Sequence, residues 1–493
     1  MNLSLLVLLP VCTFLVLLLL QARFARQVAL TGAVLQLLVC GYLLWQYLAV
    51  RDLGNTAPML FETDQVWYAP LQIHYHTGVD GIAVAMILLT ALIVLTGILV
   101  SWTIDKWQKE FFLLLLLLSA GAYGFFISLD LFTMFFFLEV AVIPKFLLIG
   151  IWGSGRKEYS AMKLALMLMA GSALVFVGLL GLYFGAGSFD MMTIAKTTLS
   201  QTSQSYIFIF LFSGFGIFAA MFPFHTWVPD GHASAPTAAS MFLAGISMKL
   251  GGYGCLRVAV FLLPQAAHQY AWAIILLAAI AIIYGAFATM MQTDLKYINA
   301  YSSVSHCGFV LLGIGMLTET SVNGAVLQMI SHGLMTALFF AAIGMIYSRT
   351  HTRMVASLGG LLKAMPFIST VFVIAGLCSL GLPGLSGFVA EMTVFMGAWQ
   401  NPDTWYRVAT VLACASIVVT AVYILRAAGK TIMGPLPENY AGLPDATWNE
   451  KTAAVLLVAA IVLMGVAPFL VTQLVHPGVE NMMRQVDKLV TLN

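Results

Sequence analysis

Apolar segments of membrane-crossing length recur along almost the whole chain. A helix needs about 20 predominantly apolar residues to cross the roughly 30 Å of hydrocarbon in a bilayer. By this criterion we predict about fourteen spans, near residues 2–20, 28–50, 79–102, 111–130, 131–152, 161–184, 205–222, 239–263, 269–291, 297–317, 321–348, 366–400, 405–430 and 452–474. Charged residues make up 9% of the chain, whereas a soluble domain carries about 25%. The sequence therefore predicts an all-α polytopic membrane protein.

The predicted spans divide the chain into four parts, with no separate soluble domain. The first apolar run lacks a basic n-region and a small-residue cleavage site, so we interpret it as the first span and not as a signal peptide. The four parts are a three-helix segment, two groups of five helices, and a C-terminal helix with its tail, over residues 1–110, 111–263, 269–430 and 452–493. Sizeable loops are expected at 51–78 and 431–451.

Lysine and arginine are distributed unevenly between the two sides of the predicted membrane. With spans that alternate in direction, one side collects 14 of the 22 basic residues and the other collects 6, while two further lysines lie within spans. The positive-inside rule assigns the richer side to the cytoplasm, or to its equivalent in an organelle. Both termini are then predicted to lie outside.

Proline and glycine interrupt two of the predicted helical segments. The first interrupted stretch, residues 222–257, reads FPFHTWVPDGHASAPTAASMFLAGISMKLGGYGCLR and contains Pro223. The second, residues 381–391, reads GLPGLSGFVAE and contains Pro383. Backbone that leaves the helix at membrane depth is tolerated where protein or a water-filled cavity satisfies its polar groups. Paired interruptions in corresponding positions indicate two inverted repeats with a polar site between them.

Two charged residues in the middle of apolar segments are the first candidates for a functional site. Glu139 lies within TMFFFLEVAVIPKFLL, and Lys249 lies within ISMKLGGYG. Ionisable residues at membrane depth are rare and mark proton or ion pathways, and buried lysines can act as proton carriers. We therefore predict proton transfer at both residues. The alternative is an ion pair that locks helices together and has no part in transport.

Two histidines and a second acid extend this set. His306 (SSVSHCGF) and His332 (LQMISHGLM) fall near the centres of their spans. Serines and a glutamine accompany them, which favours a hydrated file over the alternative of two packing histidines. Glu391 opens the half-helix after the second interruption, where the helix dipole favours a negative charge. The alternative for Glu391 is an acid that stabilises the helix end alone.

The sequence contains no motif that would hold a cofactor. The six cysteines are isolated and none forms C-x-x-C, so no iron–sulfur, zinc or c-type haem site is predicted. His225, Asp230 and His232 are potential metal ligands, but their spacing on a proline-broken loop is poor for ligation. We therefore predict no metal and no cofactor in this chain, and no basic patch suggests nucleic acid.

Several long motifs resemble one known family. The stretch 222–257, the segment QTDLKYINAYSSVSHCGFV and the segment GLPGLSGFVAE are similar to the antiporter-like membrane subunits of respiratory complex I. Within that family, HTWVPDGH, HTGVDGIAVAMILLT and QMISHGLMTALFF are most similar to subunit M, also called chain 4. The resemblance covers roughly residues 70–430. Subunits of Mrp-type cation/proton antiporters and of membrane-bound hydrogenases share much of the pattern.

The resemblance implies a fold and a set of roles. It implies fourteen helices, two inverted five-helix repeats with helices 7 and 12 broken, and a proton route along a central hydrophilic axis. The residues that match the family's motifs are the helix-five acid Glu139, the central lysine Lys249, the connecting histidines His306 and His332, the exit acid Glu391, and His225 at the helix-seven break.

One position departs from the family pattern. The family usually has a lysine seven residues before the position of His225, where it pairs with the helix-five acid, and this chain has Phe218 there. Lys145 lies six residues after Glu139, where family members mostly have an apolar residue. Either Lys145 has taken over as the cationic partner, or it snorkels to the membrane interface. We favour the takeover.

The sequence thus predicts a proton-translocating subunit of NADH–quinone oxidoreductase, in a bacterial inner membrane or its organellar equivalent. Quinone reduction elsewhere in the complex would drive protons from the cytoplasm to the outside. NADH, FMN, iron–sulfur clusters and quinone are expected in partner subunits, and the expected neighbours are other antiporter-like subunits and lipid. The alternatives are a subunit of an Mrp-type sodium/proton antiporter or of a membrane-bound hydrogenase, and a free-standing solute transporter.

Overall fold

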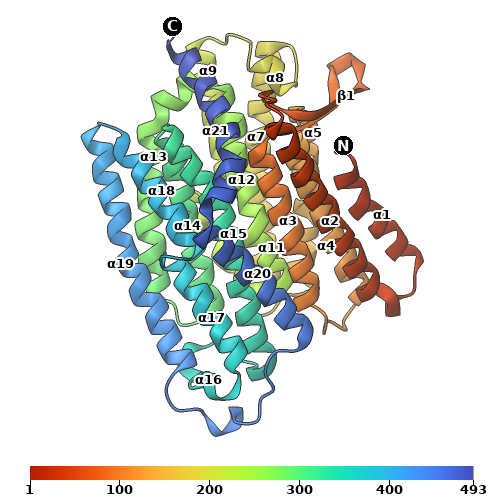
Figure 1. Cartoon of the computed structure of the whole chain (residues 1–493), viewed down its shortest axis with the longest axis vertical. Helices are drawn as coiled ribbons and strands as arrows, with labels where there is room; N and C mark the ends of the chain where they lie inside the picture. The colour runs from red at the N-terminus through yellow and green to blue at the C-terminus, as the bar shows by residue number, and fades with distance from the viewer. Residues whose placement is uncertain (492–493) are drawn as a thin grey trace.

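Helices make up most of the computed structural model (Figure 1), which describes the backbone of residues 1–491 and the side chains of residues 1–488. Within that part of the chain, nine helices are long and apolar enough to cross a membrane. They are Ala22–Asp52 (with α2 at Ala25–Asp52), α3 (Gly81–Val100), α4 (Gln108–Ile127), the pair α5 (Leu131–Val140) and α6 (Val142–Trp152), α7 (Lys157–Ala186), α13 (Pro264–Met290), α15 (Glu319–Thr350), α19 (Thr404–Ile432) and α20 (Trp448–Val466). A helical multi-pass membrane protein is confirmed.

Shorter helices fill the remaining positions of the bundle. They are α1 (Leu5–Leu19), α8 (Met191–Ile194), α9 (Gln201–Phe218), α10 (Trp227–Ser234), α11 (Thr237–Phe242), α12 (Met248–Gly254), α14 (Leu295–Gly315), α16 (Leu361–Ala364), α17 (Pro366–Ser379), α18 (Ser386–Gln400) and α21 (Pro468–Thr491), with π-helices η4 (Leu243–Ser247) and η5 (Cys255–Val260) on either side of α12. The end of the predicted tail, residues 492–493, lies outside the described residues.

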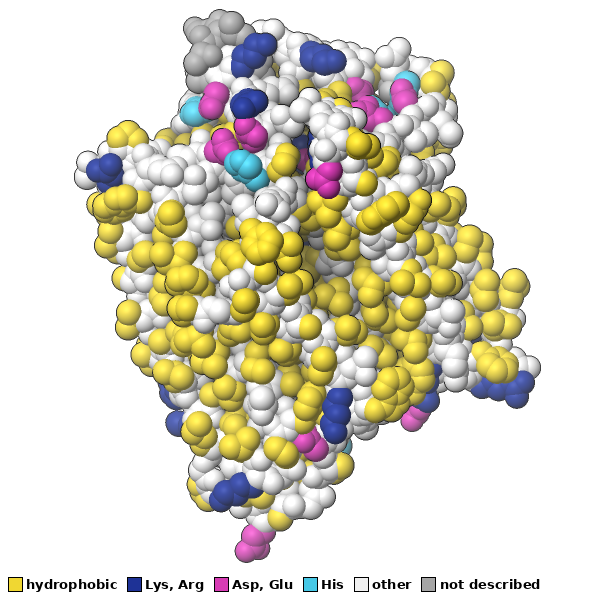
Figure 2. Space-filling view, viewed as in Figure 1, with side chains coloured by type: hydrophobic (Ala, Val, Ile, Leu, Met, Phe, Trp, Pro, Cys, Tyr) yellow, Lys and Arg dark blue, Asp and Glu magenta, His cyan; other side chains and the backbone are white. Residues whose placement is uncertain are grey.

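Apolar side chains cover the middle of the bundle, while charged side chains gather toward its two ends (Figure 2). Helix α7, for example, exposes Leu166, Met169 and Phe184 along its outer side. Exposed apolar surface on this scale marks contact with lipid or with other membrane proteins. The core lies around α15, in which every residue of the most apolar stretch is buried.

Both predicted interruptions are present as gaps between helices. Helix α9 ends at Phe218 and α10 begins at Trp227, with Pro223 between them. Helix α17 ends at Ser379 and α18 begins at Ser386, with Pro383 between them. Proline ends helices because it lacks the N–H that the ladder requires. The continuous helix expected over 131–152 is also divided, since α5 ends at Val140 and α6 begins at Val142.

The expectation of a purely helical chain with a loop over 51–78 is wrong in one region. Strands β1 (Leu60–Tyr68) and β2 (Ile73–Val79) form an antiparallel hairpin there. We call the end of the bundle that carries it the hairpin end. The hairpin is tied to the start of α5, because the Asp130 carboxylate accepts hydrogen bonds from the backbone N–H groups of His74 (3.1 Å) and Thr133 (2.9 Å).

A histidine–carboxylate pair strengthens this attachment. The Nδ1 atom of His76 lies 2.7 Å from Oδ1 of Asp190, which caps the short helix α8. The hydrogen bond to Asp190 raises the pKa of His76, although burial opposes it, and the nearby charges of Asp64 and Glu62 raise it further. Burial alone would raise the pKa of Asp190, but hydrogen bonds from His76 and Thr193 outweigh it and lower that pKa.

At the same end, a buried ion pair joins the start of α3 to η5, and a tyrosine of α12 packs against it. Asp80, at the start of α3, and Arg257, in η5, are 1% and 3% exposed and form a salt bridge. The guanidinium also lies over the Tyr253 ring, 5.6 Å from its centroid. Helix α21 closes over the pair, because a Cβ on Gly81 would lie 1.7 Å from the backbone oxygen of Leu474.

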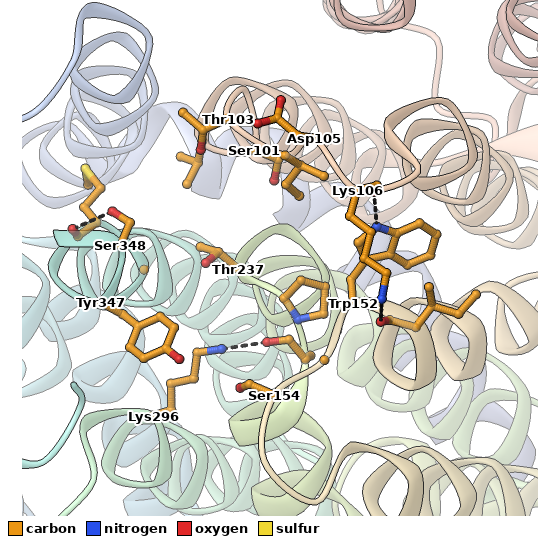
Figure 3. A pocket seen from close by; sticks show the side chains of 18 of the residues that line it. Ser101, Thr103, Asp105, Lys106, Trp152, Ser154, Thr237, Lys296, Tyr347 and Ser348 are labelled. Carbon is orange, nitrogen blue, oxygen red and sulfur yellow. Dashed lines mark hydrogen bonds between the residues drawn. The ribbon is translucent and has the colours of Figure 1, made fainter. Parts of the chain in front are cut away.

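The opposite end of the bundle holds a cavity of about 420 Å³ between the loops that precede α4 and α7 and the start of α11 (Figure 3). Ser101, Trp152, Ser154, Thr237 and Lys296 are among the residues that line it. The loops that close it are held by local hydrogen bonds, such as that from the Trp152 indole to the backbone oxygen of Lys106 (2.6 Å).

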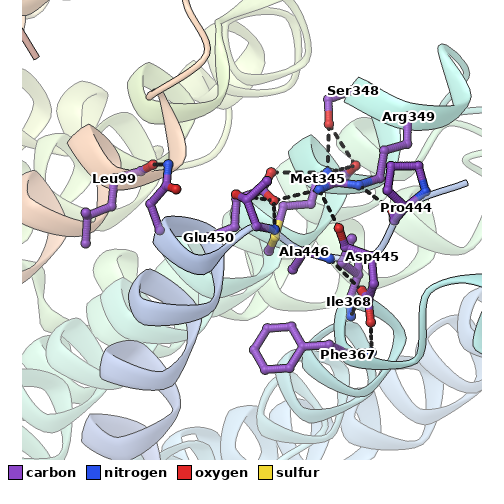
Figure 4. A network of polar contacts seen from close by, with 12 residues as sticks. Leu99, Met345, Ser348, Arg349, Phe367, Ile368, Pro444, Asp445, Ala446 and Glu450 are labelled. Atoms are coloured by element: carbon purple, nitrogen blue, oxygen red, sulfur yellow. Dashed lines mark hydrogen bonds and ion pairs between the residues drawn. The ribbon is translucent and has the colours of Figure 1, made fainter.

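A polar network at this end clamps the C-terminal part of the chain to the core (Figure 4). Arg349, near the end of α15, donates to both carboxylate oxygens of Glu450 (3.1 and 2.7 Å) and to the backbone oxygen of Pro444 (2.8 Å). Asp445 accepts from the backbone N–H of Phe367 (2.8 Å), at the start of α17. The bidentate contact fixes α15 to α20, and Asp445 attaches the start of α17 to the same network.

Replacement of Arg257 by leucine should destabilise the protein, because it leaves Asp80 as a buried carboxylate without its partner. Breaking a buried pair in this way costs about 3–5 kcal/mol. Thermal unfolding in detergent measures the loss. The double variant Asp80→Asn, Arg257→Leu should recover part of it, since asparagine still caps α3 and no buried charge remains. Equal stability of the wild type and the single variant would contradict the assignment.

The attachment of the hairpin should weaken as the pH on its side rises. Because the pKa of His76 is raised on folding, its stabilising contribution is complete below about pH 6.5, the ordinary histidine value, and is lost as the pH rises through the raised value. Amide hydrogen exchange of residues 73–79, corrected for the intrinsic rate, should therefore accelerate at high pH. The variant His76→Gln should abolish this dependence, and His74→Gln, at the more exposed pair with Asp64, is the matched control.

Candidate functional site

Four of the predicted site residues form one continuous series of contacts in the core. The Nζ atom of Lys249 lies 2.6 Å from Nδ1 of His332. The rings of His332 and His306 have centroids 5.4 Å apart. The Nδ1 atom of His306 lies 3.3 Å from Oε1 of Glu391. All four side chains are buried, so the structure brings together a lysine, two histidines and a glutamate, with His332 and not His306 next to the lysine.

Four neighbouring helices in the middle of the bundle supply these side chains (Figure 1). Lys249 comes from α12, His306 from α14, His332 from α15 and Glu391 from α18. Two further polar groups join the series at His306. Its Nε2 atom lies 3.0 Å from the Ser379 hydroxyl, and its Nδ1 atom lies 3.3 Å from Nε2 of Gln328.

The local backbone explains how Lys249 is placed. The two π-helices flank its helix, and π-turns inside helices are frequent at functional sites because they displace the regular ladder. The Lys249 amine donates to the backbone oxygen of Ala244, within η4. Gly251 lets α12 approach the end of α9 closely, because a Cβ there would lie 2.2 Å from the backbone nitrogen of Ala219.

The second interruption places Glu391. Gly381 has a φ of +75°, a conformation that side chains other than glycine rarely adopt. A Cβ at this position would also lie 2.8 Å from Oε2 of Glu391. The turn therefore packs directly against the carboxylate, and a larger residue would displace it.

Lys145 lies apart from this series, in a buried position beside the departure from the family pattern. Its side chain is 0% exposed, and its amine lies 5.9 Å from the centroid of the Phe218 ring. Within the described residues, the amine has no hydrogen-bond partner and forms no ion pair with Glu139. Complete burial contradicts the alternative in which Lys145 snorkels to the membrane interface.

Glu139 is half-buried and faces the side of the bundle. It lines a groove between α5 and α7, together with Phe135, Met169, Ser172 and Phe176. Its Oε1 atom has no hydrogen-bond partner among the described residues. A carboxylate on a lipid-facing surface is costly, so this position suits contact with another polar group from outside the chain.

Three polar residues of the first interruption, His225, Asp230 and His232, contact different partners. The His225 ring stacks on Phe222, with centroids 5.5 Å apart, and Asp230 forms an ion pair with Lys163 at 2.7 Å. The His232 ring stacks on Phe340, with centroids 5.3 Å apart. In the part of the chain that the structure describes, no three histidine, cysteine or acidic side chains converge in the manner of a metal site.

Several buried polar atoms along the core have no protein partner. They include both ring nitrogens of His232, Nε2 of His332, the Ser247 hydroxyl, Oε1 of Gln328 and both amide atoms of Asn299. Buried polar groups are normally satisfied by protein or by ordered water, and internal waters typically bond to such groups. These atoms are buried on the same helices as the contact series or on their neighbours, where ordered water would satisfy them. Groups in hydrogen-bond contact, or one water apart, can pass protons.

Sequence reasoning missed three groups near the site. Ser379 was not singled out, although it directly precedes the second interruption. The positive-inside count places Lys163 and Lys296 among the 14 basic residues of the richer side, yet Lys163 pairs with Asp230 and Lys296 is 4% exposed. Lys296 lies two residues after Asp294, which caps α14, so an N-cap motif in QTDLKYINAY could have placed it in the first turn of the helix.

Comparison with known proteins agrees with this geometry. A family profile described as NADH:quinone oxidoreductase/Mrp antiporter, TM, matches residues 128–420. The NADH-quinone oxidoreductase subunit M of Rhodobacter capsulatus is 36% identical over 476 residues, which cover 94% of this chain and 91% of that protein. The NAD(P)H-quinone oxidoreductase chain 4 1 of Synechococcus sp. (strain JA-3-3Ab) is 38% identical over 483 residues, which cover 96% of this chain and 90% of that protein.

Solved structures show the same fold. A chain of respiratory complex I from Thermus thermophilus superposes with a TM-score of 0.89 at 27% identity, over 98% of this chain and 99% of that one. A chain of the Mrp complex from Dietzia sp. DQ12-45-1b superposes with a TM-score of 0.83 at 19% identity, over 98% and 99% of the two chains, a likeness of fold alone. With the family profile matching most of its length and full-length relatives 36% and 38% identical, this chain belongs to the subunit M (chain 4) family of NADH–quinone oxidoreductase, the antiporter-like membrane subunits of complex I.

Proposed function

We propose that the chain translocates protons as a membrane subunit of NADH–quinone oxidoreductase. The observation that carries this proposal is the buried contact series Lys249–His332–His306–Glu391, with neighbouring members linked at 2.6 Å, at 5.4 Å between ring centroids, and at 3.3 Å. Each member can bind and release a proton. A change of charge at one member alters the proton affinity of the next, which is how a pump couples one transfer to another.

In this proposal the chain crosses the membrane fourteen times. To the nine long helices we add α1, the broken pair α9–α10, the segment α11–η5, α14, and the broken pair α17–α18. The five crossings from α4 to η5 and the five from α13 to α19 form the two inverted repeats. The hairpin end is the outer side, toward which both chain termini lie (Figure 1). Protons then travel from the opposite, cytoplasmic end to the hairpin end.

Redox chemistry belongs to partner subunits in this proposal. NADH, FMN, iron–sulfur clusters and quinone are bound elsewhere, and their reactions reach this chain through its membrane neighbours. The groove beside Glu139, between α5 and α7, supports contact with a neighbouring antiporter-like subunit. A polar group from that neighbour would satisfy the Glu139 oxygen that lacks a partner within this chain.

The rival function is sodium/proton exchange in an Mrp-type antiporter. The fold suits both functions, since an Mrp chain superposes on this one. The relatives that cover almost the whole chain are named as quinone oxidoreductase subunits, which favours the redox-driven pump. The interior of inverted vesicles that contain the native assembly should therefore acidify when NADH is added, without added sodium. A strict requirement of this acidification for sodium would favour the rival.

Lys145 takes the cationic place that Phe218 vacates, as we infer from their contact. The amine lies over the Phe218 ring, so a cation occupies the neighbourhood of the usual lysine although it comes from another helix. Glu139, on the preceding helix α5, is the acid that this cation would serve in the proposal.

Lys249→Ala should leave the complex assembled and reduce proton pumping at least about tenfold, since removal of a positioned proton-transfer group commonly costs a factor of about 10²–10⁴. Pumping is measured as NADH-driven acidification of inverted vesicles, and assembly by native gel electrophoresis. Lys363→Ala, at an exposed lysine of the cytoplasmic end, is the control. An assembled Lys249→Ala complex that pumps at the wild-type rate would overturn the proposed function.

Lys145→Met should also impair pumping, because methionine keeps the apolar stem and removes the buried cation at the Phe218 ring. The double variant Lys145→Met, Phe218→Lys returns a cation to the same place from the other helix, so it should restore part of the lost rate. Both are measured in the same vesicles, with Lys363→Met as the matched loss of a lysine. A single variant with full activity would show that Lys145 serves packing alone.

A further inference from the structure

The cavity at the cytoplasmic end leads from the surface toward the core (Figure 3). Its lining combines polar loop residues with the start of α11, directly after the first interruption. A volume of about 420 Å³ is ample for several water molecules, since one water needs about 10–15 Å³ of such space. The innermost charged group on its wall is Lys296, which is 4% exposed.

The Lys296 amine reaches the backbone of the interrupted segment. It donates a hydrogen bond of 2.6 Å to the backbone oxygen of Ala235, drawn in Figure 3. Ala235 joins α10 to α11 and lies three residues after His232. The amine therefore touches the cavity on one side and the segment that carries His232 on the other.

His232 is the next titratable group toward the core. It is 0% exposed, and neither ring nitrogen has a hydrogen-bond partner among the described residues. Its backbone oxygen accepts a hydrogen bond of 3.0 Å from the Ser240 hydroxyl on α11, and its ring stacks on Phe340 of α15, the helix that carries His332. A buried imidazole with two free nitrogens has the chemistry of a proton relay.

We propose that protons enter this chain through the cavity, with Lys296 as the receiving group and His232 as the relay to Lys249. This inference rests on the proposed function and extends it to the cytoplasmic side. The Lys296 ammonium gives a proton to a free ring nitrogen of His232 and becomes a neutral amine. That amine takes its next proton from water in the cavity, and the imidazolium passes its proton on when Lys249 is neutral.

Other charged groups around the Lys296 amine are engaged with partners of their own. On the inner side, Arg353 pairs with Asp294 at 3.2 Å and donates to the backbone oxygen of Ala233 at 2.7 Å. Across the cavity, Lys157 donates to the backbone oxygen of Ile151 at 3.1 Å, and Glu450 is held by Arg349. Lys296, like Lys157, is bonded to a neutral carbonyl and can lose its proton without breaking an ion pair, but of the two only Lys296 is buried and reaches the interrupted segment.

The variant Lys296→Arg distinguishes a proton-transfer role of Lys296 from a purely structural one. Lys296→Arg keeps the positive charge and the donor to Ala235, and the cavity has room for the larger group, but arginine does not release its proton. We expect NADH-driven pumping to fall at least tenfold with assembly unchanged. Lys157→Arg, on the wall of the same cavity, should retain the wild-type rate. An assembled Lys296→Arg complex that pumps at the wild-type rate overturns the proposal.

A chemical block tests the cavity without altering Lys296. Ser154→Cys places a thiol on its wall, and a charged, membrane-impermeant methanethiosulfonate reaches it from the cytoplasmic side of inverted vesicles. Labelling should slow pumping severalfold. The control is Ser357→Cys, an exposed position at the same end but outside the cavity, and labelled wild type gives the background from Cys12 and Cys414. Complete labelling of Ser154→Cys without loss of rate also overturns the proposal.

Different results would contradict the proposed pump and the proposed entry route. If Lys249→Ala pumps normally, the proposed function itself is wrong. If Lys249→Ala is inactive while Lys296→Arg and the labelled Ser154→Cys complex both pump at the wild-type rate, the pump stands and protons enter by another route.

Discussion

Membrane hydrocarbon offers no hydrogen-bond partners, and this constraint accounts for where the chain places its polar groups. Backbone outside helices at this depth must be buried in protein or face water. Both interruptions accordingly lie within the bundle, and each places an ionisable side chain near the axis. Lys249 meets the constraint through the Ala244 oxygen and His332, and Glu391 meets it through His306. The same contacts that make these groups tolerable in the membrane hold them in one buried series, the arrangement on which the proposed proton route depends.

A second consequence is that position in space matters more than position in sequence. The family resemblance implies a lysine where this chain has Phe218, and in the structure a buried amine lies against that ring. The amine belongs to Lys145, which the division between α5 and α6 places in the core. An electric field depends on where a charge lies and not on which helix supplies it. Supply of the cation by a different helix is therefore compatible with an unchanged role for Glu139.

The parts of the fold that depend on local chemistry could be predicted from the sequence. The gaps at Pro223 and Pro383 appear where predicted, because proline lacks the N–H that the helix ladder requires and the neighbouring Gly381 adopts a positive φ. The hairpin was missed because its strands (LFETDQVWY and IHYHTGV) lie between membrane segments and are polar enough to read as loop. What orders them is the attachment to Asp130 and Asp190, which lie far along the chain. Lys296 was counted as a surface residue, because its burial depends on the α10–α11 turn that packs over it.

The sequence by itself determined a multi-pass helical membrane protein, its family, and the identity of the ionisable groups within the membrane. Hydropathy and helix-breaking residues act over short stretches of the chain. They can therefore be interpreted without knowing which segments pack against one another. The tertiary structure alone decided which of those groups touch. It joined Lys249, His332, His306 and Glu391, turned Glu139 toward the side of the bundle, and set Lys145 against Phe218. Contacts between residues 83 positions apart, as for Lys249 and His332, follow from how helices pack, and helix packing depends on all their surfaces at once.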